Sequence, residues 1–453
     1  MTFMENKSTH LQQLFTEGTE LLQAGNAAQA LICFKDALAI DPENPQFHLY
    51  AGAALHDLGR YGEAVDSYHN AIRVAPQMGE AYNNLGNSQM ALGRHSEAVA
   101  SFSHAAGLLV SSPVPLTARA TSLQALGRIT ESEADCRRAL QRDPNFAAAH
   151  WNLALNLLLQ GRYTEGWPEY EWRWLKPDFT SPSRHTDIPL WDGSPLEGRT
   201  ILLHAEQGFG DAIQFVRYAP LVAQRGGIVV LECHSQLVSL FQGVAGVKEV
   251  IPFGSPLPSF ACQAPLLSLP RLFETTIQNI PSACPYLSVV AEKRRKWSDL
   301  VSWYPAGLKV GLVWAGKSYP DPLRSFRLAE LAPLAGAGVT FFSLQLGTGS
   351  DQSSSPPPGI GLVDLVHHID DFADTAALIE QLDLVISIDT AVAHLAGALG
   401  KPVWLLLPFA PDWRWMVGQS DSLWYPTMRL FRQEQPGEWV PVIKRIAECL
   451  PKK

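Results

Sequence analysis

The chain has 453 residues, which is too many for one hydrophobic core, so two or three domains are expected. Its contents of 46% hydrophobic and 17% charged residues are ordinary for a globular protein. The net charge of −9 gives no basic footprint for nucleic acid, although a local basic pocket for a phosphate ligand stays possible.

Cysteine usage and the N-terminus indicate where the protein works. The six cysteines are scattered without a C-x-x-C pair, so neither a zinc site nor a disulfide framework is expected. The start, MTFMENKSTH, lacks the pattern of a signal peptide, and no apolar run approaches the roughly 18 residues that span a bilayer. These features predict a cytoplasmic protein with no integral membrane segment.

The first part of the chain repeats itself every 34 residues. Small, aromatic and glycine positions recur at that interval: Ala30, Ala64 and Ala98; Phe34, Tyr68 and Phe102; Gly18, Gly52 and Gly86. Small residues let paired helices approach, and an aromatic fills the space between pairs. The pattern resembles the tetratricopeptide repeat over three units, with two degenerate units after Pro113 and Ala147. We therefore expect an all-α superhelical array over residues 1–174.

Two asparagines of the array are candidates for binding a peptide. Asn84 and Asn152 occupy the same repeat position, two periods apart, on the first helix of their units. An Asn side chain there could hydrogen-bond a peptide backbone on the concave surface. Tyr50 and Ala118 interrupt the ladder in other units, and a solvated face is the alternative interpretation.

A change of texture follows the array. Residues 175–198 are rich in Pro, Ser and Asp and predict a linker. Beyond it, apolar runs alternate with helical segments, which predicts two Rossmann-like α/β domains over 199–304 and 305–453, the second with a C-terminal helix. The expected strands are TILLHA, GIVVLEC, KEVIPF, APLLSL, LKVGLVWA, VTFFSLQ, LDLVISID and KPVWLLLP.

The first candidate motif is HAEQGFGDAIQF, directly after an expected strand. Gln207, Gly208 and Gly210 form a loop at the strand's carboxyl end, where ligands of open α/β sheets bind. Ile213 stands where the dinucleotide fingerprint has its third glycine, so that function is not indicated. Asp211, at the start of the next helix, is either a helix cap or a general base.

The second motif, LDLVISIDTAVAHLAGALGKPVW, predicts a strand, a turn and a helix. Asp389 and Thr390 stand at the strand end, and His394 lies one turn into the helix. Free backbone N–H groups and the helix dipole make such a helix start a natural cradle for a diphosphate. His394 could donate a hydrogen bond to the charge that develops on a leaving phosphate.

Further polar residues are expected around the same cleft. Lys317, Arg324 and Ser325 follow another strand and suit an anionic ligand. Gln345 ends the strand VTFFSLQ and could bind a base or ribose, and Arg414 is another candidate contact for phosphate or ribose. All these residues are grouped as a donor-binding site.

With these motifs in view, the α/β half resembles the heptosyltransferase family of GT-B glycosyltransferases. The resemblance rests on QGFGDAIQF and IDTAVAHLAGALGKPVW and spans roughly Arg199 to Leu450. It implies that Asp211 is the catalytic base, that Asp389, Thr390 and His394 bind the donor's diphosphate, and that no metal or other cofactor is needed. Fusion to repeats is also similar to protein O-linked GlcNAc transferases, so the donor sugar stays open.

The sequence therefore predicts an inverting, metal-independent glycosyltransferase that uses a nucleoside-diphosphate sugar as co-substrate. The acceptor would be a hydroxyl, on a protein or peptide presented by the repeats. One alternative is an inactive scaffold for protein interactions with a degenerate nucleotide-sugar-binding half. Another is transfer to a lipid or saccharide, which would leave the repeats without a role in catalysis.

Overall fold

The computed structural model describes residues 2–317, 322–336 and 338–450. The chain divides into two compact units, Met1–Asn156 and Leu157–Lys453. The first unit thus ends before residue 174, where the sequence analysis ended the array.

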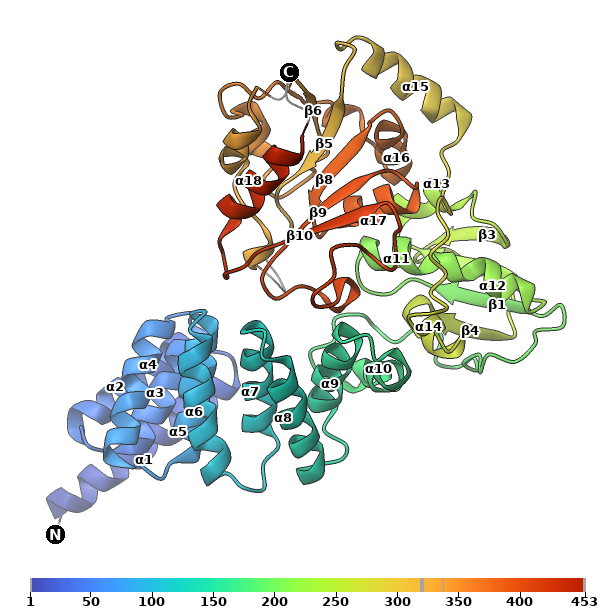
Figure 1. Ribbon diagram of the computed structural model, residues 1–453. Coiled ribbons are helices and arrows are strands. Elements are labelled where there is room, and N and C mark those ends of the chain that lie inside the picture. Colours follow the sequence, from blue (N-terminus) through green and yellow to red (C-terminus); the bar gives the residue numbers. More distant parts are fainter. Residues whose placement is uncertain (1, 318–321, 337, 451–453) are drawn as a thin grey trace. The chain divides into compact units, whose positions relative to one another are not determined.

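The first unit consists of helix pairs stacked one on the next, as the blue and cyan part of Figure 1 shows. The helices are α1 (Thr2–Gln23), α2 (Ala27–Ile40), α3 (Pro45–Asp57), α4 (Tyr61–Val74), α5 (Gly79–Ala91), α6 (His95–Leu108), α7 (Val114–Ala125), α8 (Ile129–Arg142) and α9 (Ala147–Leu159), which crosses into the second unit. This is the tetratricopeptide superhelix expected from the 34-residue period.

In the three regular repeats, a glycine of the first helix faces an aromatic ring of the second. A Cβ on Gly86 would lie 2.6 Å from Cε1 of Phe102, so only glycine fits. From the second repeat on, ion pairs follow the same period at the start of the second helix: Arg60–Glu63, Arg94–Glu97, Arg128–Glu131 and Arg162–Glu165. This second ladder escaped the sequence analysis.

The second unit contains two parallel sheets, which are called the first and second sheet below. The first sheet has the order β3-β2-β1-β4, with strands β1 (Thr200–His204), β2 (Ile228–Cys233), β3 (Val247–Pro252) and β4 (Cys262–Pro265). Its helices are α11 (Phe209–Phe215), α12 (Ala219–Gln224), α13 (Val238–Phe241) and α14 (Leu269–Leu272). The expected strand APLLSL is wrong in its second half, because Leu266–Ser268 already turns into a 3-10 helix.

The second sheet has six strands in the order β10-β9-β8-β5-β6-β7. They are β5 (Lys309–Val313), β6 (Thr340–Ser343), β7 (Leu362–Val363), β8 (Leu384–Ile388), β9 (Val403–Leu407) and β10 (Met428–Arg432). Its helices are α16 (Phe372–Glu380), α17 (Ala391–Ala398) and α18 (Trp439–Cys449), and α15 (Ala291–Ser302) connects the two sheets. Helix α18 packs within the second half, against β10 and the segment Leu328–Leu334, and the ring centres of Trp439 and Phe326 lie 5.3 Å apart. The two sheets form the two Rossmann-like domains expected from the sequence.

The Pro- and Ser-rich segment 175–198 folds against the first sheet. The Trp191 N–H donates to the carbonyl of Gln263 over 2.8 Å, and the His185 ring lies 2.8 Å from the Glu232 carboxylate. The segment is therefore part of the second unit.

Aromatic side chains of helix α10 (Tyr163–Tyr170) anchor it within the second unit. The Trp167 indole N–H donates to the carbonyl of Thr275 over 2.8 Å, and its ring packs edge-on against Trp413. The Trp424 indole N–H donates to the Tyr163 hydroxyl over 3.1 Å. Trp167 and Tyr170 are thus buried against the α/β half.

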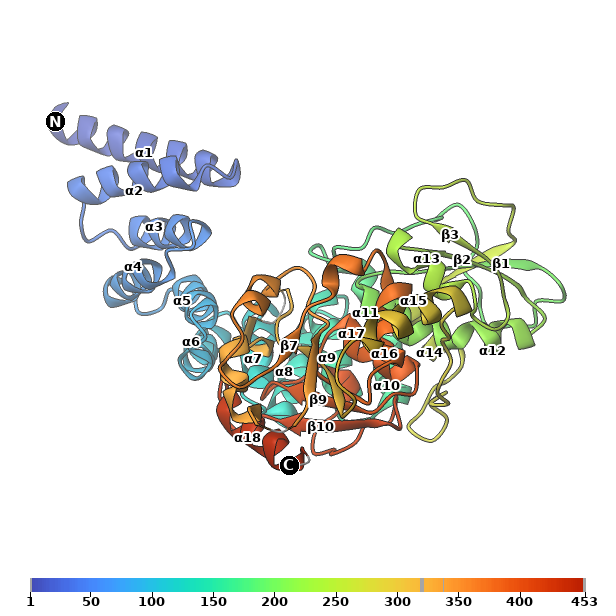
Figure 2. The same cartoon turned by 90° about the horizontal axis from the view of Figure 1, so that it is seen from above.

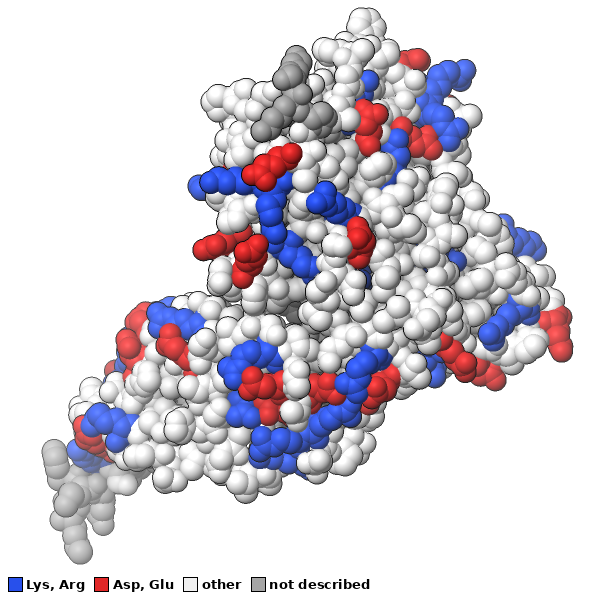
Figure 3. Space-filling view, viewed as in Figure 1, with Lys and Arg blue, Asp and Glu red and all other residues white. Residues whose placement is uncertain are grey.

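Charged side chains of both signs are interspersed on the face shown in Figure 3, with no large patch of one sign. Among the helices that the structure describes, none is long and apolar enough to cross a membrane.

Candidate active site

The two sheets approach each other through α11 and α17, the helices that follow β1 and β8 (Figures 1 and 2). A Cβ on Gly210 would lie 2.9 Å from Cδ2 of His394 and 3.5 Å from Cα of Ala391. Gly210, which the sequence predicted to lie in a loop, is therefore the residue of α11 at which this helix contacts α17. It allows residues of both sheets to share one site.

Asp211 is the third residue of α11, and both of its carboxylate oxygens accept hydrogen bonds. Oδ2 accepts from the backbone N–H of Gly208 over 2.9 Å, and Oδ1 accepts from Nη2 of Arg414 over 2.5 Å. The side chain is 18% exposed. Asp211 thus caps its helix, and one lone pair on each of its oxygens is engaged.

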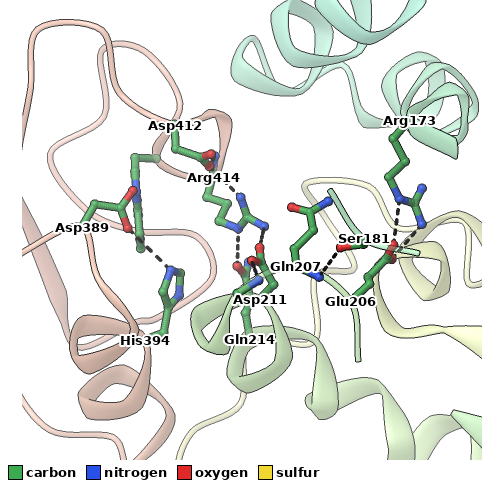
Figure 4. Close-up of polar contacts among 12 residues, drawn as sticks. Arg173, Ser181, Glu206, Gln207, Asp211, Gln214, Asp389, His394, Asp412 and Arg414 are labelled. Atoms are coloured by element: carbon green, nitrogen blue, oxygen red, sulfur yellow. Dashed lines mark hydrogen bonds and ion pairs between the residues drawn. The ribbon is translucent and has the colours of Figure 1, made fainter. Parts of the chain in front are cut away.

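Arg414 reaches Asp211 from the loop after β9, and its guanidinium is surrounded by acceptors (Figure 4). Nε donates to Oε1 of Gln214 over 2.6 Å, and Nη1 donates to Oδ1 of Asp412 over 2.9 Å. Burial lowers the pKa of Arg414, but the carboxylates of Asp412 and Asp211 outweigh it and hold the pKa above its usual value. The arginine is therefore a fixed positive charge.

Asp412 experiences the opposite balance. Burial raises its pKa, and the nearby Asp389 carboxylate adds to that effect, while Arg414 opposes it. The Arg414 guanidinium thus pairs with the carboxylates of Asp211 and Asp412, and the Asp389 carboxylate lies close by. An anionic ligand beside Arg414 would therefore need further positive charge or protons.

Asp389 and His394 form a second polar group at the start of α17. Nε2 of His394 lies 3.6 Å from Oδ1 of Asp389, and Nδ1 lies 2.9 Å from the Tyr425 hydroxyl. The imidazole, 5% exposed, stacks on Trp415, whose indole N–H donates to Oδ2 of Asp389 over 2.8 Å. Burial raises the pKa of Asp389, but the nearby His394, the hydrogen bond from Trp415 and the charge of Arg414 outweigh it, so the pKa is lowered.

These contacts limit how His394 can meet a ligand. Both of its ring nitrogens already face a polar partner, so a phosphate oxygen would have to replace one of them. Thr390 stands at the N-cap, and its hydroxyl lies 3.2 Å from that of Ser387. The backbone N–H groups of Ala391 and Val392 precede the first intrahelical bonds and point out of the helix start.

Gln345 does not have the role that the sequence suggested. Oε1 accepts from the N–H groups of Trp314 and Ala315, and Nε2 donates to the carbonyls of Ala315 and Thr348, all at 2.8–2.9 Å. With both donors and both acceptor sites used, the 2% exposed amide has no group left for a base or ribose. Gln345 instead fixes the loop after β5.

The other cations and Ser325 lie around that loop. Arg324 donates to the carbonyls of Lys317 at 3.0 Å and Asp389 at 3.4 Å, and its buried Nε has no partner within the described residues. Ser325 accepts from the Gly316 N–H over 3.0 Å, and the Lys317 side chain is exposed. Arg324 therefore links this loop to the strand end that bears Asp389.

A groove of about 420 Å³ opens beside the same loop. It is lined by Ala315, Gly316, Ser325, Phe326, Arg327, Glu330, Thr348, Gly349, Asp351 and Gln352. Its volume falls within the range of small-ligand sites. Of the residues predicted to bind the donor, Ser325 alone is among those that line it.

The loop before α11 is held by buried contacts. Gln207 has φ of +60°, its N–H donates to the Ser181 hydroxyl over 2.9 Å, and its Nε2 is buried with no partner in the described part of the chain. Glu206 pairs with Arg173, which is fully buried, over 2.8 Å. Gln207, four positions before Asp211, is thus held by Ser181 of the segment predicted to be a linker.

Four residues of the site escaped the sequence analysis, namely Gln214, Asp412, Tyr425 and His234. Gln214 lies inside the first quoted motif and Asp412 two residues before Arg414, but only the fold shows that both contact Arg414. His234 follows β2 next to the Phe209 ring, and its buried Nδ1 has no partner among the residues described. Its place after a strand was the one available signal.

The two asparagines of the array differ in their surroundings. Asn152 donates to the carbonyl of Thr117 over 3.2 Å and to the hydroxyl of Thr121 over 2.9 Å, so its amide ties α9 to α7. Asn84 accepts a long hydrogen bond from Asn83 at 3.4 Å. Asn84 is therefore the freer of the two to meet a peptide.

Comparison with known proteins agrees with both halves. Models of the tetratricopeptide repeat match residues 15–68, 52–93, 79–108 and 117–176, and the model of glycosyltransferase family 9 (heptosyltransferase) matches residues 370–406. The chain carries tetratricopeptide repeats followed by a heptosyltransferase-like segment. That segment covers α16, β8 and α17 and so includes Asp389, Thr390 and His394.

A curated relative spans both halves. The protein FlbA of Caulobacter vibrioides is 28% identical over 349 residues, which are 70% of this chain. The chain spans 58% of the length of that relative.

Solved structures match about a third of the chain. MamA of Desulfovibrio magneticus is 15% identical, with a TM-score of 0.32 over 36% of this chain and 90% of its own. The tetratricopeptide protein TTC0263 of Thermus thermophilus is 21% identical, with a TM-score of 0.32 over 36% of this chain and 88% of its own. PilF of Pseudomonas aeruginosa is 18% identical, with a TM-score of 0.35 over 37% of this chain and 76% of its own.

Proposed function

We propose that the second unit transfers a sugar from a nucleoside-diphosphate donor to an acceptor hydroxyl, with inversion and without a metal. The observation that carries this proposal is the meeting of Asp211, from the first sheet, with Arg414 and the Asp389–His394 pair, from the second. The second group lies in and beside the segment similar to family 9 glycosyltransferases. Such a transfer requires a base beside the acceptor and a binding site for the leaving diphosphate. A carboxylate can act as the base, and the start of a helix can bind the diphosphate.

In the proposed reaction, Asp211 takes the proton of the acceptor hydroxyl as the oxygen attacks the anomeric carbon. The bond from that carbon to the diphosphate breaks, and its electron pair leaves with the diphosphate. The N–H groups at the start of α17, with Thr390 and His394, would stabilise the charge that develops there. The nucleotide sugar is a co-substrate, and no resident cofactor takes part.

The donor would lie along the carboxyl ends of the second sheet. The groove beside Ser325 suits a nucleoside, and Arg324 lies between it and the strand end at Asp389. Lys317, with its exposed ammonium group, could approach the phosphates from solvent. This arrangement makes a GT-B type of donor site.

The repeats indicate which class of acceptor the enzyme would use. Arrays of this kind present concave surfaces that bind extended chains, so a protein or peptide is the acceptor favoured here, in the cytoplasm. Asn84 would contribute to that surface. If the acceptor is instead a lipid or saccharide, deletion of residues 1–150 should barely change its use.

A second candidate function is an inactive scaffold, which the closed contacts at the site favour. Both oxygens of Asp211 and both nitrogens of His394 have partners, and Gly210 packs on α17 with no space between. Calorimetry with UDP-, ADP- and GDP-linked sugars distinguishes the two. Binding of one of them, followed by its transfer to lysate proteins detected by mass spectrometry, supports the enzyme, whereas binding of none supports the scaffold.

A further inference from the structure

We infer that Arg414 is a positioning residue that restrains Asp211 and releases it when the diphosphate of the donor binds. The inference rests on the proposed transferase and concerns how its two halves are coupled. It assigns to Arg414 a place between base and donor, where the sequence indicated only a phosphate or ribose contact.

The contacts of Arg414 come from both sheets. Asp211 and Gln214 belong to α11, beside the first sheet, whereas Asp412 belongs to the same loop of the second sheet as Arg414 itself. The side chain is 8% exposed, and its guanidinium lies 4.4 Å from the centre of the Trp413 ring. Each of the three guanidinium nitrogens therefore donates to an acceptor.

The contact restrains Asp211 by occupying part of its carboxylate. Oδ2 accepts from the N–H of Gly208 and Oδ1 accepts from Nη2 of Arg414, so one lone pair of each oxygen is engaged. An acceptor hydroxyl that approaches Oδ1 has to share that oxygen with the guanidinium. Asp211 is freer to take up a proton once Nη2 has turned away.

A diphosphate supplies the reason for Nη2 to turn. Asp389, at the start of α17, lies close enough to Arg414 for their charges to interact. A diphosphate at that helix start carries at least two negative charges and matches the planar fork of the guanidinium better than one carboxylate. Nη1 can keep its bond to Asp412 while Nη2 moves, so a small rotation exchanges the partners.

The exchange makes a thermodynamic prediction. If Asp211 and the diphosphate compete for Nη2, removal of the Asp211 charge must tighten diphosphate binding, and it must do so through Arg414. The test is a double-variant cycle on the full chain, with Asp211→Asn, Arg414→Gln and the double variant. Calorimetry measures the affinities for inorganic pyrophosphate and for UDP, ADP and GDP.

The expected result is a gain of about tenfold in affinity in Asp211→Asn and a loss in Arg414→Gln, with no gain from Asp211→Asn in the Arg414→Gln background. Arg414→Lys should give an intermediate affinity because it keeps the charge but not the fork. The matched controls Arg294→Gln and Glu380→Gln remove an exposed arginine–carboxylate pair of the same unit and should change nothing.

Two results would overturn the inference while leaving the proposed function intact. One is an unchanged or weaker affinity in Asp211→Asn. The other is a gain that persists without Arg414, because it would then reflect general repulsion between Asp211 and the ligand. If the parent protein binds none of the four probes, the donor site itself is wrong, and the inference falls with it.

Discussion

Arg414 donates from Nη2 to Oδ1 of Asp211 over 2.5 Å, although the two residues are 203 positions apart and lie beside different sheets. An ion pair with both members largely buried loses far more when one member is removed than an exposed pair does. The side chains are 8% and 18% exposed. The contact therefore ties the two Rossmann-like domains together at the point where the proposed chemistry takes place.

The first prediction concerns the base. Asp211→Asn should abolish sugar transfer while a nucleotide sugar still binds, because an amide cannot take up the acceptor proton but can still accept from Gly208. Turnover measured by mass spectrometry, together with calorimetry of donor binding, checks it. A general base contributes about 10²–10⁴-fold in rate, so a smaller loss contradicts the assignment.

Much of the fold could be predicted from the sequence. The 34-residue period is visible in single residues such as Gly86 and Phe102, because one packing contact recurs in the three regular units. Buried parallel strands read as continuous apolar runs, which revealed β5, β6, β8 and β9. Strand β10 was missed because it lies at the sheet edge and alternates, with Arg429 exposed between buried neighbours.

The site was less predictable, for a physical reason. Local patterns placed Asp211, Asp389 and His394 at strand and helix ends, where the structure has them. Partners of buried polar groups come from distant parts of the chain, so no pattern showed that Arg414 pairs with Asp211. Gln345 was misread for the same reason, since three of its four partners are backbone groups of Trp314 and Ala315, on the strand end that precedes it by about thirty residues.

The second prediction tests the contact between α11 and α17. Gly210→Ala should lower the free energy of unfolding by about 1–3 kcal/mol, because its Cβ would press on the buried ring of His394. Urea unfolding followed by tryptophan fluorescence measures the effect. Twelve of the 13 tryptophans follow residue 156, so this signal reports on the second unit.

Gly361→Ala is the control for Gly210→Ala, since nothing lies within 4 Å of its Cβ position. It should leave the unfolding curve in place. Equal stability of both variants would show that α11 can move away from His394 at little cost. The close approach would then not be required by the fold.

The third prediction is a pH dependence of stability. Burial lowers the pKa of His204 from 6.5 to about 4, against the hydrogen bond of Gln263, which raises it. Between these values the unfolded chain binds more protons than the folded chain, so the free energy of unfolding falls as the pH drops from 6.5 to 4. The full effect of one such group is about 3 kcal/mol.

His204→Gln removes that titration and should flatten the decline, whatever its effect on absolute stability. Urea midpoints at several pH values between 4 and 7, again by tryptophan fluorescence, give the slope. His69→Gln changes an exposed histidine of the first unit and should leave the slope unchanged. Parallel curves for His204→Gln and the parent protein would refute the prediction.

The fourth prediction concerns the repeats. Gly86→Ala on α5 should destabilise the first unit by about 1–3 kcal/mol, because the new methyl group would lie 2.6 Å from Cε1 of the fully buried Phe102 ring. Gly107→Ala on α6 is the matched control, since nothing lies within 4 Å of its Cβ position. There, the higher helix propensity of alanine should stabilise by up to about 1 kcal/mol. Hydrogen exchange of peptides from residues 79–108, measured by mass spectrometry, should therefore become faster in one variant and no faster in the other. Equal protection in both would mean that the glycine–aromatic contact, and with it the physical basis of the 34-residue period, contributes little to the stability of the array.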